Sequence, residues 1–572
     1  MKRIPLNLNA VGFGTVFVVF VLTLVFGAST ANAQARADHI LENGKVLTVD
    51  RNFSITESIA ITGDRISAVG TNAEVRRLAG PNTKVTDLGG KTVIPGLIDN
   101  HNHYVRGLAT WPMEVRLDTV TSHKKALEMI SARVKSLNPG EWILVIGGWQ
   151  VQQFLDDPRG FTQVELDEAA PNNPVFIQIG FSNGVANSLA LKTAGVKRNQ
   201  PPGPPPGAGP GAGSGARRAR SASPFGGGFA AEIKKALPEL TAERWKEFLS
   251  RTNEDYNRAG VTAVWEASGF VGPAGRDRLK WTKEFAETQG WLGVRMFYPL
   301  KSSNPRDVSG MIQVVKNSLP DARNPYFAVH GLGEVNIGPL FDMVGRGFIR
   351  ARQPGSLEQA SEQFKALAMA AAEKRMSIIE HTMVPEKYDL LLTMFEEIDK
   401  SYDINPLRWR FDHNYGIKRV HMDRAKVLGI TLGMHTTSAL AGGAGPRMGP
   451  DTPPFKTAQE SGIVWGLGTD TGIVAPWHPF FTLSFAVTGK NAAGKLVNKT
   501  EKVSRKEALI AATRSNAYIL LQEKNLGSIE VGKYADLVVL NKDYLTIPED
   551  EIKTIESVLT LVGGRVGYKA KN

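Results

Sequence analysis

Residues 93–103 read VIPGLIDNHNH, an apolar run that ends in two histidines one residue apart. If this run is a buried strand, its side-chain period of two places His101 and His103 on the same face at the strand's end. Two imidazoles that converge there can share one metal ion, and imidazole is a common ligand of zinc and neighbouring metals. Two close histidines also arise by chance or in hydrogen-bonded loops, so the interpretation depends on the rest of the chain.

The centre of the chain alternates compact apolar runs with helical ones. Strand-like runs lie at 142–147, 174–179, 260–265, 293–298, 326–329, 376–379, 409–411, 430–434 and 463–467. Such alternation over about 350 residues predicts a parallel α/β core, for which a closed (β/α)8 TIM barrel is a common single-domain solution. An open doubly wound sheet is the alternative. No glycine-rich phosphate loop follows a strand, which argues against a dinucleotide-binding version.

Both ends of the chain are rich in short strands and turns, which predicts one small β-domain closed by both termini. We therefore expect the N-terminal part of this β-domain at 34–94, the barrel at 95–523 and the C-terminal part of the β-domain at 524–572. Residues 200–229 are rich in proline and glycine and predict a flexible insertion within the barrel.

Residues 1–33 have the pattern of a secretory signal peptide. Lys2 and Arg3 precede an apolar run, and Ala31-Asn32-Ala33 fits a cleavage site. We expect an exported protein, in the periplasm of a Gram-negative bacterium, without stable membrane insertion after the signal is removed; an uncleaved anchor is the alternative.

The composition restricts the chemistry of any metal site. The 572 residues include no cysteine, so a metal must be bound by histidine, carboxylate or water. The net charge of +12 comes mostly from scattered basic residues. We interpret these residues as part of the solvated surface and not as a nucleic-acid-binding site.

Ionisable residues follow several of the predicted strands in chain order. In a (β/α)8 barrel the active site lies where the strands end. Besides His101 and His103, these positions hold His381, His413, His435 and Asp470. Together they predict a ligand set for a divalent metal: two imidazoles from one strand, one each from two later strands, and a carboxylate from the last.

The order of these residues resembles the metal-dependent amidohydrolase superfamily, most of all amidohydrolase family 3 with its N-substituted formamide deformylase-like proteins. The resemblance covers essentially the whole mature chain. It rests on motifs at 95–103 (PGLIDNHNH), 187–191 (NSLAL), 260–262 (GVT), 468–470 (GTD) and 527–540 (GSIEVGKYADLVVL). It implies the same barrel, a β-sandwich built from both termini, a divalent metal such as zinc with one or two ions, and a small-molecule substrate.

The resemblance also implies roles for individual residues. His101 and His103 would bind the more buried metal, and His381 and His413 the second metal or the substrate. Asp470 would be both a metal ligand and the proton shuttle. The metal lowers the pKa of water so that hydroxide is available near neutral pH, Asp470 passes the water proton to the leaving nitrogen, and His381 or His413 stabilises the oxyanion. The implied reaction is hydrolysis of a non-peptide carbon–nitrogen bond.

The chain departs from the family pattern in two places. Many members carry a carboxylated lysine after the fourth strand, but no lysine occurs at 326–338. Glu334, His330 or Glu266 could replace it as a metal ligand, or the site holds a single ion. The histidine that often precedes the Asn-Ser motif is also absent from 180–184.

The substrate pocket, the bond that is hydrolysed and the assembly remain to be considered. We expect His435, His478 and His330 to line the substrate pocket. The same metal site could instead hydrolyse an ester, lactone or phosphoester, or the barrel could be a catalytically lapsed periplasmic binding protein. A homodimer is one alternative for the assembly.

Overall fold

The computed structural model describes residues 36–197, 228–301, 307–318, 324, 326–343, 347–348, 355–436 and 451–571. By its internal contacts, Arg36–Asn572 is one compact unit, separate from Met1–Ala35. The predicted signal peptide and most of the proline- and glycine-rich insertion lie outside the described residues. The predicted end of that insertion differs from the structure, because Phe229 is buried and begins helix α6 (Phe229–Lys234).

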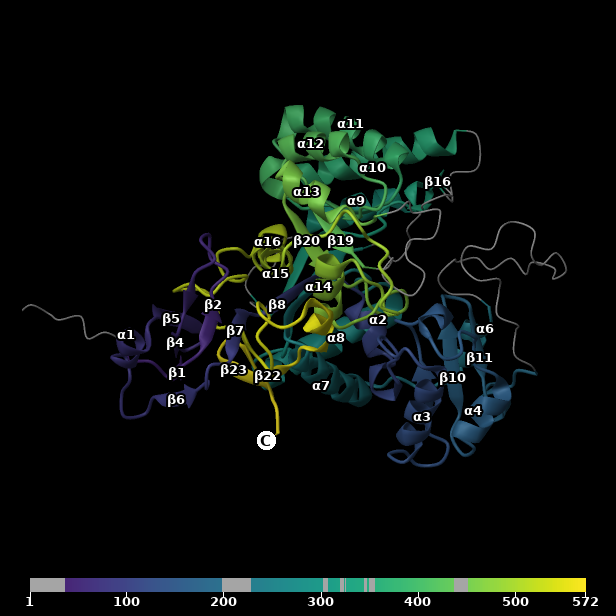
Figure 1. The fold of residues 1–572 in the computed structure, drawn as a ribbon. Helices are drawn as coiled ribbons and strands as arrows, with labels where there is room; N and C mark the ends of the chain where they lie inside the picture. Colours follow the sequence, from purple (N-terminus) through teal and green to yellow (C-terminus); the bar gives the residue numbers. More distant parts are fainter. Residues whose placement is uncertain are drawn as a thin grey trace, which may run out of the picture. The chain divides into compact units, whose positions relative to one another are not determined.

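The α/β core contains two parallel four-stranded sheets with the strand orders β14-β13-β12-β8 and β17-β18-β19-β20 (Figure 1). The strands of the first sheet are β8 (Leu97–Asn102), β12 (Val261–Glu266), β13 (Arg295–Leu300) and β14 (Phe327–Leu332). Those of the second are β17 (Ile379–Thr382), β18 (Arg410–His413), β19 (Thr431–His435) and β20 (Trp465–Gly468). The runs expected as strands after residue 260 therefore all overlap strands, although the run at 376–379 does so only at Ile379, where β17 begins.

The two sheets are joined at both edges, and each junction has a single residue pair. One junction lies between β14 and β17, and the other between β8 and β20. Leu332 pairs in parallel with Ile378, and Asn102 pairs in parallel with Thr471. The backbone N–H of Asp470 also donates to the carbonyl of His101 at 2.8 Å. These contacts bring the carboxyl ends of β8 and β20 together, although the ladders themselves form two sheets and not one continuous one.

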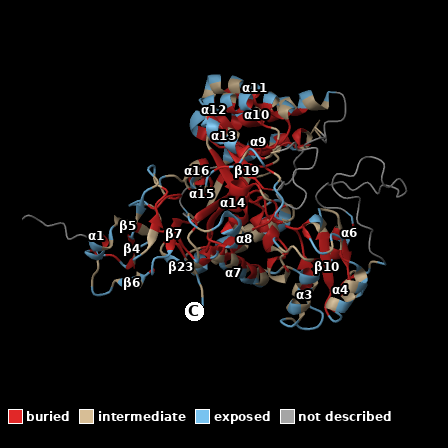
Figure 2. Cartoon of the chain, in the orientation of Figure 1, coloured by how far each residue is buried: buried red, intermediate tan, exposed pale blue. Residues whose placement is uncertain are grey.

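Helices alternate with these strands, as the sequence predicts. They are α2 (Tyr104–Leu108), α7 (Ala242–Arg258), α8 (Gly272–Gln289), α9 (Val308–Asn317), α10 (Ser356–Glu373), α11 (Pro385–Tyr402), α12 (Arg419–Val427), α13 (Phe455–Ser461), α14 (Pro479–Thr488), α15 (Arg505–Ala512) and α16 (Arg514–Ile519). Side chains of the helices and of the second sheet form one large apolar cluster, which includes Phe364, Phe395 and Trp409. The interior of the core is accordingly buried, and most of its helices expose their outer faces, whereas α14 is buried along its whole length (Figure 2).

The structure differs from the sequence expectation for residues 142–147 and 174–179, which do not join the core sheets. They form β9 (Ile143–Val145) and β10 (Val175–Ile179), which make a separate three-stranded sheet with β11 (Asn183–Ala186). The helices α3 (His123–Val134), α4 (Gln163–Ala169) and α5 (Ser188–Ala194) pack on this sheet. It buries its own apolar side chains, such as Val145 and Ile177, in a cluster separate from the one around the second core sheet.

The two ends of the chain contribute to a common six-stranded sheet with the order β23-β22-β21-β7-β2-β3. Its strands are β2 (Lys45–Leu47), β3 (Ile55–Thr56), β7 (Thr92–Pro95), β21 (Leu537–Leu540), β22 (Ser557–Val562) and β23 (Arg565–Lys569). A second sheet contains β1 (His39–Glu42), β4 (Ser58–Thr62), β5 (Arg65–Gly70) and β6 (Lys84–Asp87), beside α1 (Asn72–Arg76). Ile59 and Ile61 of this sheet share one apolar cluster with Val93 and Leu537 of the other.

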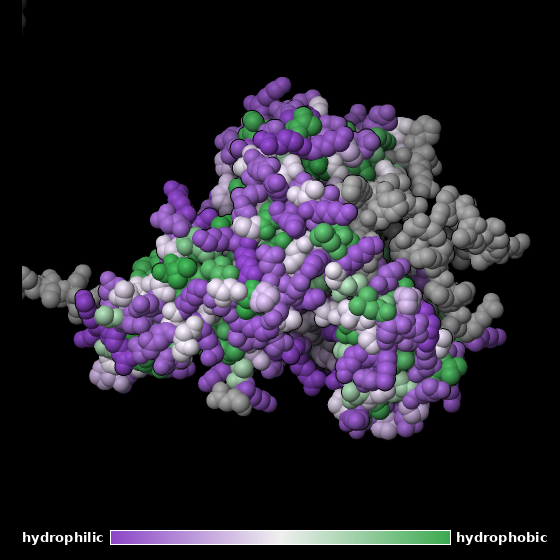
Figure 3. Space-filling model, in the orientation of Figure 1, coloured by the Kyte–Doolittle hydropathy of each residue, from purple (hydrophilic) through white to green (hydrophobic). Residues whose placement is uncertain are grey.

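Apolar side chains on the surface are scattered. The face in Figure 3 is mainly hydrophilic, with small separate apolar areas, and the exposed large apolar residues come from different elements, among them Leu155 and Val427. Within the described residues no helix has both the length and the apolarity that crossing a membrane requires.

Candidate metal centre

The carboxyl ends of the two core sheets bring the predicted site residues together. His101 is the fifth residue of β8, and His103 follows directly after that strand. His381 lies in β17, His413 ends β18, and Asp470 lies two residues after β20. Glu334, which the sequence offered as one of three replacements for the missing lysine, lies two residues after β14.

His101, His103 and Glu334 form a first group of possible metal ligands. His101 Nε2 lies 3.8 Å from Glu334 Oε1, and His103 Nε2 lies 3.9 Å from Glu334 Oε2. Asp470 lies next to this group, with its Oδ1 at 3.6 Å from His101 Nε2 and 3.1 Å from His103 Nε2. The separations of 3.6 to 3.9 Å are longer than a hydrogen bond and suit ligand atoms arranged around a common cation, whereas His103 and Asp470 are within hydrogen-bond distance.

Glu334, His381 and His413 form a second group. Glu334 Oε1 lies 3.2 Å from His381 Nδ1 and 3.1 Å from His413 Nε2. Glu334 thus belongs to both groups. Burial alone would raise the pKa of Glu334, but the charge of His101 and hydrogen bonds from His381 and His413 hold that pKa well below its ordinary value.

His435 lies within this cluster, beyond the substrate-pocket role expected for it. Together with His101, His413 and Asp470 it makes a third set of possible ligands. Its Nδ1 is 3.1 Å from His413 Nδ1. His413 and Asp470 both have left-handed backbone conformations, with φ of 75° and 58°. Such conformations cost energy in residues other than glycine and are frequent where a site fixes side-chain directions.

The residues present fit a divalent metal. His101 Nε2 and His435 Nε2 are buried, and neither has a hydrogen-bond partner among the described residues. An unpaired buried nitrogen is costly unless something binds it. Nitrogen and carboxylate donors at this density match zinc and similar ions.

Polar residues behind the ligands fix their orientation. Asp412 Oδ2 lies 2.6 Å from His101 Nδ1 and so leaves Nε2 to face the cluster. The side chain of Asp412 is itself paired with Arg410, at 2.7 Å. Ser268 Oγ contacts His103 Nδ1 at 2.8 Å. No motif in the sequence points to Asp412, Arg410 or Ser268 as supporting residues. The only available signal was the position of Asp412 at a strand end, beside His413.

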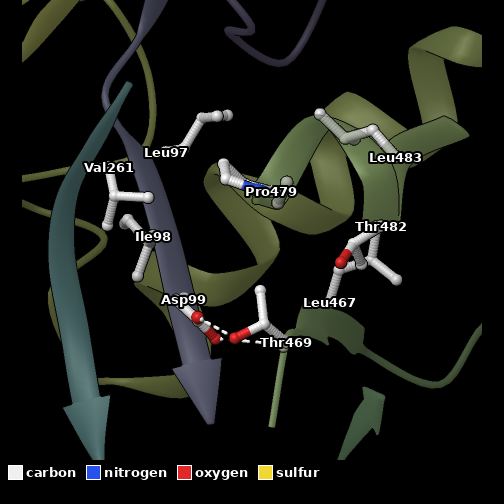
Figure 4. A pocket seen from close by; sticks show the side chains of 11 residues that line it. Leu97, Ile98, Asp99, Val261, Leu467, Thr469, Pro479, Thr482 and Leu483 are labelled. Atoms are coloured by element: carbon white, nitrogen blue, oxygen red, sulfur yellow. Dashed lines mark hydrogen bonds between the residues drawn. The ribbon is translucent and has the colours of Figure 1, made fainter. Parts of the chain in front are cut away.

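Asp99 ties the end of β8 to the end of β20. It accepts hydrogen bonds from the Thr469 backbone and hydroxyl, at 2.9 and 2.6 Å, and from Asn102. Figure 4 shows the Asp99–Thr469 contact at one end of a small cavity that is otherwise lined mostly by apolar side chains, including Leu97, Ile98 and Leu483. This cavity offers no converging polar groups, and we interpret it as packing space.

Three other sequence candidates do not join the ligand groups found among the described residues. His330 is buried in β14, where its carbonyl accepts from Trp265 Nε1, and burial lowers the pKa of its imidazole to about 3. His478 precedes α14, with its ring 5.3 Å from that of Trp477. Glu266 accepts the backbone N–H groups of Val105 and Ser268, both at 2.6 Å.

Comparison with known proteins identifies the class. Residues 84–568 match the model of the amidohydrolase family, so the chain belongs to that family. It is 26% identical to N-substituted formamide deformylase from Arthrobacter pascens, over 93% of this chain and 98% of that protein. It is 24% identical to the putative amidohydrolase YtcJ from Bacillus subtilis, over 93% and 99%.

Solved structures agree with the fold. A metal-dependent hydrolase from Pyrococcus horikoshii superimposes with a TM-score of 0.60 at 19% identity, covering 90% of this chain and 99% of that one. An adenosine deaminase from Xanthomonas campestris, crystallised with bound zinc, gives 0.52 at 14% identity, covering 94% of each. The predicted enzyme class, a metal-dependent amidohydrolase acting on carbon–nitrogen bonds, is confirmed.

Proposed function

We propose that this chain hydrolyses a non-peptide, amide-type carbon–nitrogen bond of a small molecule, at a centre of one or two divalent ions held by His101, His103, Glu334, His381, His413 and Asp470. The observation that carries the proposal is Glu334, whose carboxylate belongs to both ligand groups. A carboxylate there supplies a shared anionic ligand where many relatives use a carboxylated lysine. The full-length relation to a formamide deformylase makes N-substituted formamides the first substrates to test.

The residues divide the chemistry between them. Divalent zinc lowers the pKa of water toward neutrality and polarises a carbonyl. Asp470 lies 3.1 Å from His103 Nε2 and 3.7 Å from His413 Nδ1, and these neighbours help to hold its pKa low despite burial. An ionised Asp470 can accept a proton from the attacking water and return it to the leaving nitrogen. The imidazole of His381 or His413 stabilises the oxyanion.

The experiment combines metal analysis with one substitution. Freshly purified protein should contain zinc or a similar ion, and it should hydrolyse members of a panel of formamides, other amides, cyclic ureides, esters, lactones and phosphoesters. Asp470→Asn should lower kcat by roughly 10²- to 10⁴-fold, the usual contribution of general acid–base catalysis. An empty site, or amide turnover that survives this substitution, would reject the proposal; turnover of esters, lactones or phosphoesters alone would reassign the bond.

We also propose that the two core sheets close into a (β/α)8 barrel and that the two terminal sheets form a β-sandwich. The pairs Leu332–Ile378 and Asn102–Thr471 support the closure, and the apolar cluster shared by the terminal sheets supports the sandwich. A crystal structure with continuous ladders at both junctions would establish the barrel.

Export to the periplasm is a further part of the proposal and is supported by residues 1–33 alone. Expression in a Gram-negative host should place a protein that begins near Gln34 in the periplasmic fraction. A mature protein that retains Met1 in the cytoplasm would contradict it.

A further inference from the structure

Two cationic side chains beside the ligand cluster form no ion pair within the described part of the chain. Arg106 lies in α2, three residues after His103, and Lys301 follows directly after β13. Nε and Nη2 of Arg106 are buried and have no hydrogen-bond partner in the described part of the chain. Lys301 Nζ has one long contact, 3.5 Å to the carbonyl of Ala267. Among the described residues, no carboxylate forms an ion pair with either.

The fold places both cations at the edge of the sheet that carries the site. β8, β12, β13 and β14 are neighbours in that order, so Arg106 and Lys301 follow strands that flank β12 and end beside Glu334. Arg106 also reaches the loop after Asp470, because a Cβ on Gly472 would lie 3.3 Å from Arg106 Nη2 and 3.5 Å from His103 Cβ. The Cβ of Lys301 would lie 3.4 Å from a Cβ on Gly269, in the loop after β12.

The fully buried cations in the described part of this chain, by contrast, are paired with carboxylates. Arg410 pairs with Asp412, Arg295 with Asp536, and Lys387 with Glu380. Arg106 and Lys301 as whole residues are partly buried, but Nε and Nη2 of Arg106 are fully buried without a hydrogen-bond partner among the described residues. Leaving such charged groups unpaired is expensive, so Arg106 beside the site implies a missing anion. Burial lowers the pKa of both Arg106 and Lys301, which agrees with the lack of close partners.

The chain itself offers few candidates for that anion. Asp470, Glu334 and Glu266 lie close enough to attract these cations, but within the described residues none forms an ion pair with either. Asp470 and Glu334 are engaged by histidines, and Glu266 accepts two backbone N–H groups. The internal segments outside the described residues contain a single acidic residue, Asp321, in their sequence. The missing partner is therefore best supplied by a ligand.

We propose that Arg106 and Lys301 form an anion subsite that binds a carboxylate of the substrate beside the scissile carbon–nitrogen bond. This inference rests on the proposed function and narrows its substrate class to amides that carry a carboxylate. A planar guanidinium matches a carboxylate through two parallel N–H···O bonds, and the lysine adds a point charge. In this arrangement the scissile carbonyl, where negative charge develops, lies beside the metal ligands. The substrate carboxylate lies beside Arg106 and Lys301.

The test compares N-formyl amino acids with their decarboxylated N-formyl amines, for example N-formylphenylalanine with N-formyl-2-phenylethylamine, over glycine, leucine, phenylalanine and glutamate side chains. The metal-loaded wild type should prefer at least one acid over its amine, by tenfold or more in kcat/KM. Arg106→Gln and Lys301→Met should each raise KM for that acid by roughly 10- to 100-fold, the range expected for a lost charged hydrogen bond. KM for the amine should stay unchanged, and Arg106→Lys should recover part of the loss.

Calorimetric titration of the same acids into metal-free protein gives a readout that does not depend on turnover. Arg251→Gln is the matched control, because Arg251 is exposed on α7 and pairs with Glu247. If the acids bind the wild type but not Arg106→Gln, and nothing is hydrolysed, the subsite stands and the proposed function fails. If every amine is hydrolysed with the same kcat/KM as its acid, the subsite is wrong. It is also wrong if no acid binds more tightly to the wild type than to Arg106→Gln.

Discussion

Asp412 fixes the orientation of the His101 imidazole. Its carboxylate holds His101 Nδ1 at 2.6 Å, so that Nε2 faces Glu334 and Asp470. Replacing it with asparagine removes the charge that strengthens this contact, and we expect Asp412→Asn to weaken metal binding by about 10- to 100-fold. Competition with a chelator such as dipicolinate measures the change.

Asp423→Asn is the control for that substitution, because Asp423 is exposed and pairs only with Arg419 at the surface among the described contacts. Circular dichroism must show that Asp412→Asn is folded, since Arg410 loses part of its buried counter-charge. Unchanged metal affinity in a folded Asp412→Asn protein would contradict the role given to Asp412.

His39 predicts an acid sensitivity that is independent of the metal centre. Burial and the neighbouring Lys84 lower the pKa of His39 from 6.5 to about 4, so the folded chain holds it neutral. Below pH 6.5 the unfolded chain binds a proton that the folded chain does not bind until about pH 4. The stability that His39 contributes is therefore complete above pH 6.5 and is lost as the pH falls toward 4.

Substituting His39 should reduce this acid sensitivity. A glutamine can still contact Thr86, which lies 2.9 Å from His39 Nε2. His39→Gln should therefore lose less stability than the wild type between pH 7.5 and 5, as measured by the urea midpoint at each pH. An equal loss in both proteins would show that other groups determine the acid sensitivity.

At the scale of elements, Asn187 explains why the sequence carries an Asn-Ser motif. The side chain caps α5 by accepting from Ala190 N, and it also accepts from Val175 N in β10. Its amide donates to the carbonyls of Ala170 and Asn173. One buried amide thus joins the helix, the strand and the preceding loop.

We expect Asn187→Ala to lower the free energy of unfolding by about 3 kcal/mol, because it removes a helix cap and leaves buried backbone groups unpaired. Ser188→Ala, at the exposed neighbour, removes only exposed hydrogen bonds with Asp167 and Gln163 and should cost at most about 1 kcal/mol. Urea denaturation compares the two, and hydrogen exchange should locate the loss in the sheet of β9, β10 and β11. A loss below 1 kcal/mol for Asn187→Ala would mean that water satisfies those groups.

Periodicity and strand-end positions predicted most of the elements and most of the cluster. His101, His103, His381, His413 and Asp470 follow apolar runs, and the structure brings them together because parallel strands end at one edge. The sequence could not show that residues 142–147 pair with a local hairpin and not with the core, since an isolated strand looks the same in either sheet. It could not separate Glu334 from His330, because only the folded loop decides which one faces the histidines.

Arg106 and Lys301 show a different limit. Lone cations near strand ends are usually solvated, and nothing in their spacing distinguishes these two from scattered basic residues. Their interpretation depends on the lack of an ion-pair partner among the described residues and on the two unpaired guanidinium nitrogens of Arg106, which only a folded structure can reveal. Asp412 was hidden for a related reason, because its partner His101 lies 311 positions away.

For the molecule as a whole, one buried ion pair connects the end of the chain to the sheet that carries the site. Arg295 begins β13, and its guanidinium binds both carboxylate oxygens of Asp536, at 2.8 and 2.9 Å. Asp536 also accepts from Gly563 N in the turn between β22 and β23. The other end of β13 is followed by Lys301, so the same strand spans from the terminal sheet to the proposed anion subsite.

Asp536→Ala tests how much this connection contributes. The substitution leaves the Arg295 side chain, only 1% exposed, without its counter-charge, and we expect a loss of about 3–5 kcal/mol in the free energy of unfolding. Asp543→Ala is the control: Asp543 pairs with Lys45 at 2.7 Å, but both side chains are about one-third exposed, so the expected cost is at most about 1 kcal/mol. Denaturant unfolding monitored by tryptophan fluorescence measures both losses. If the two variants lose the same small amount, Arg295 is accommodated without Asp536, and apolar packing alone holds the terminal sheet to the core.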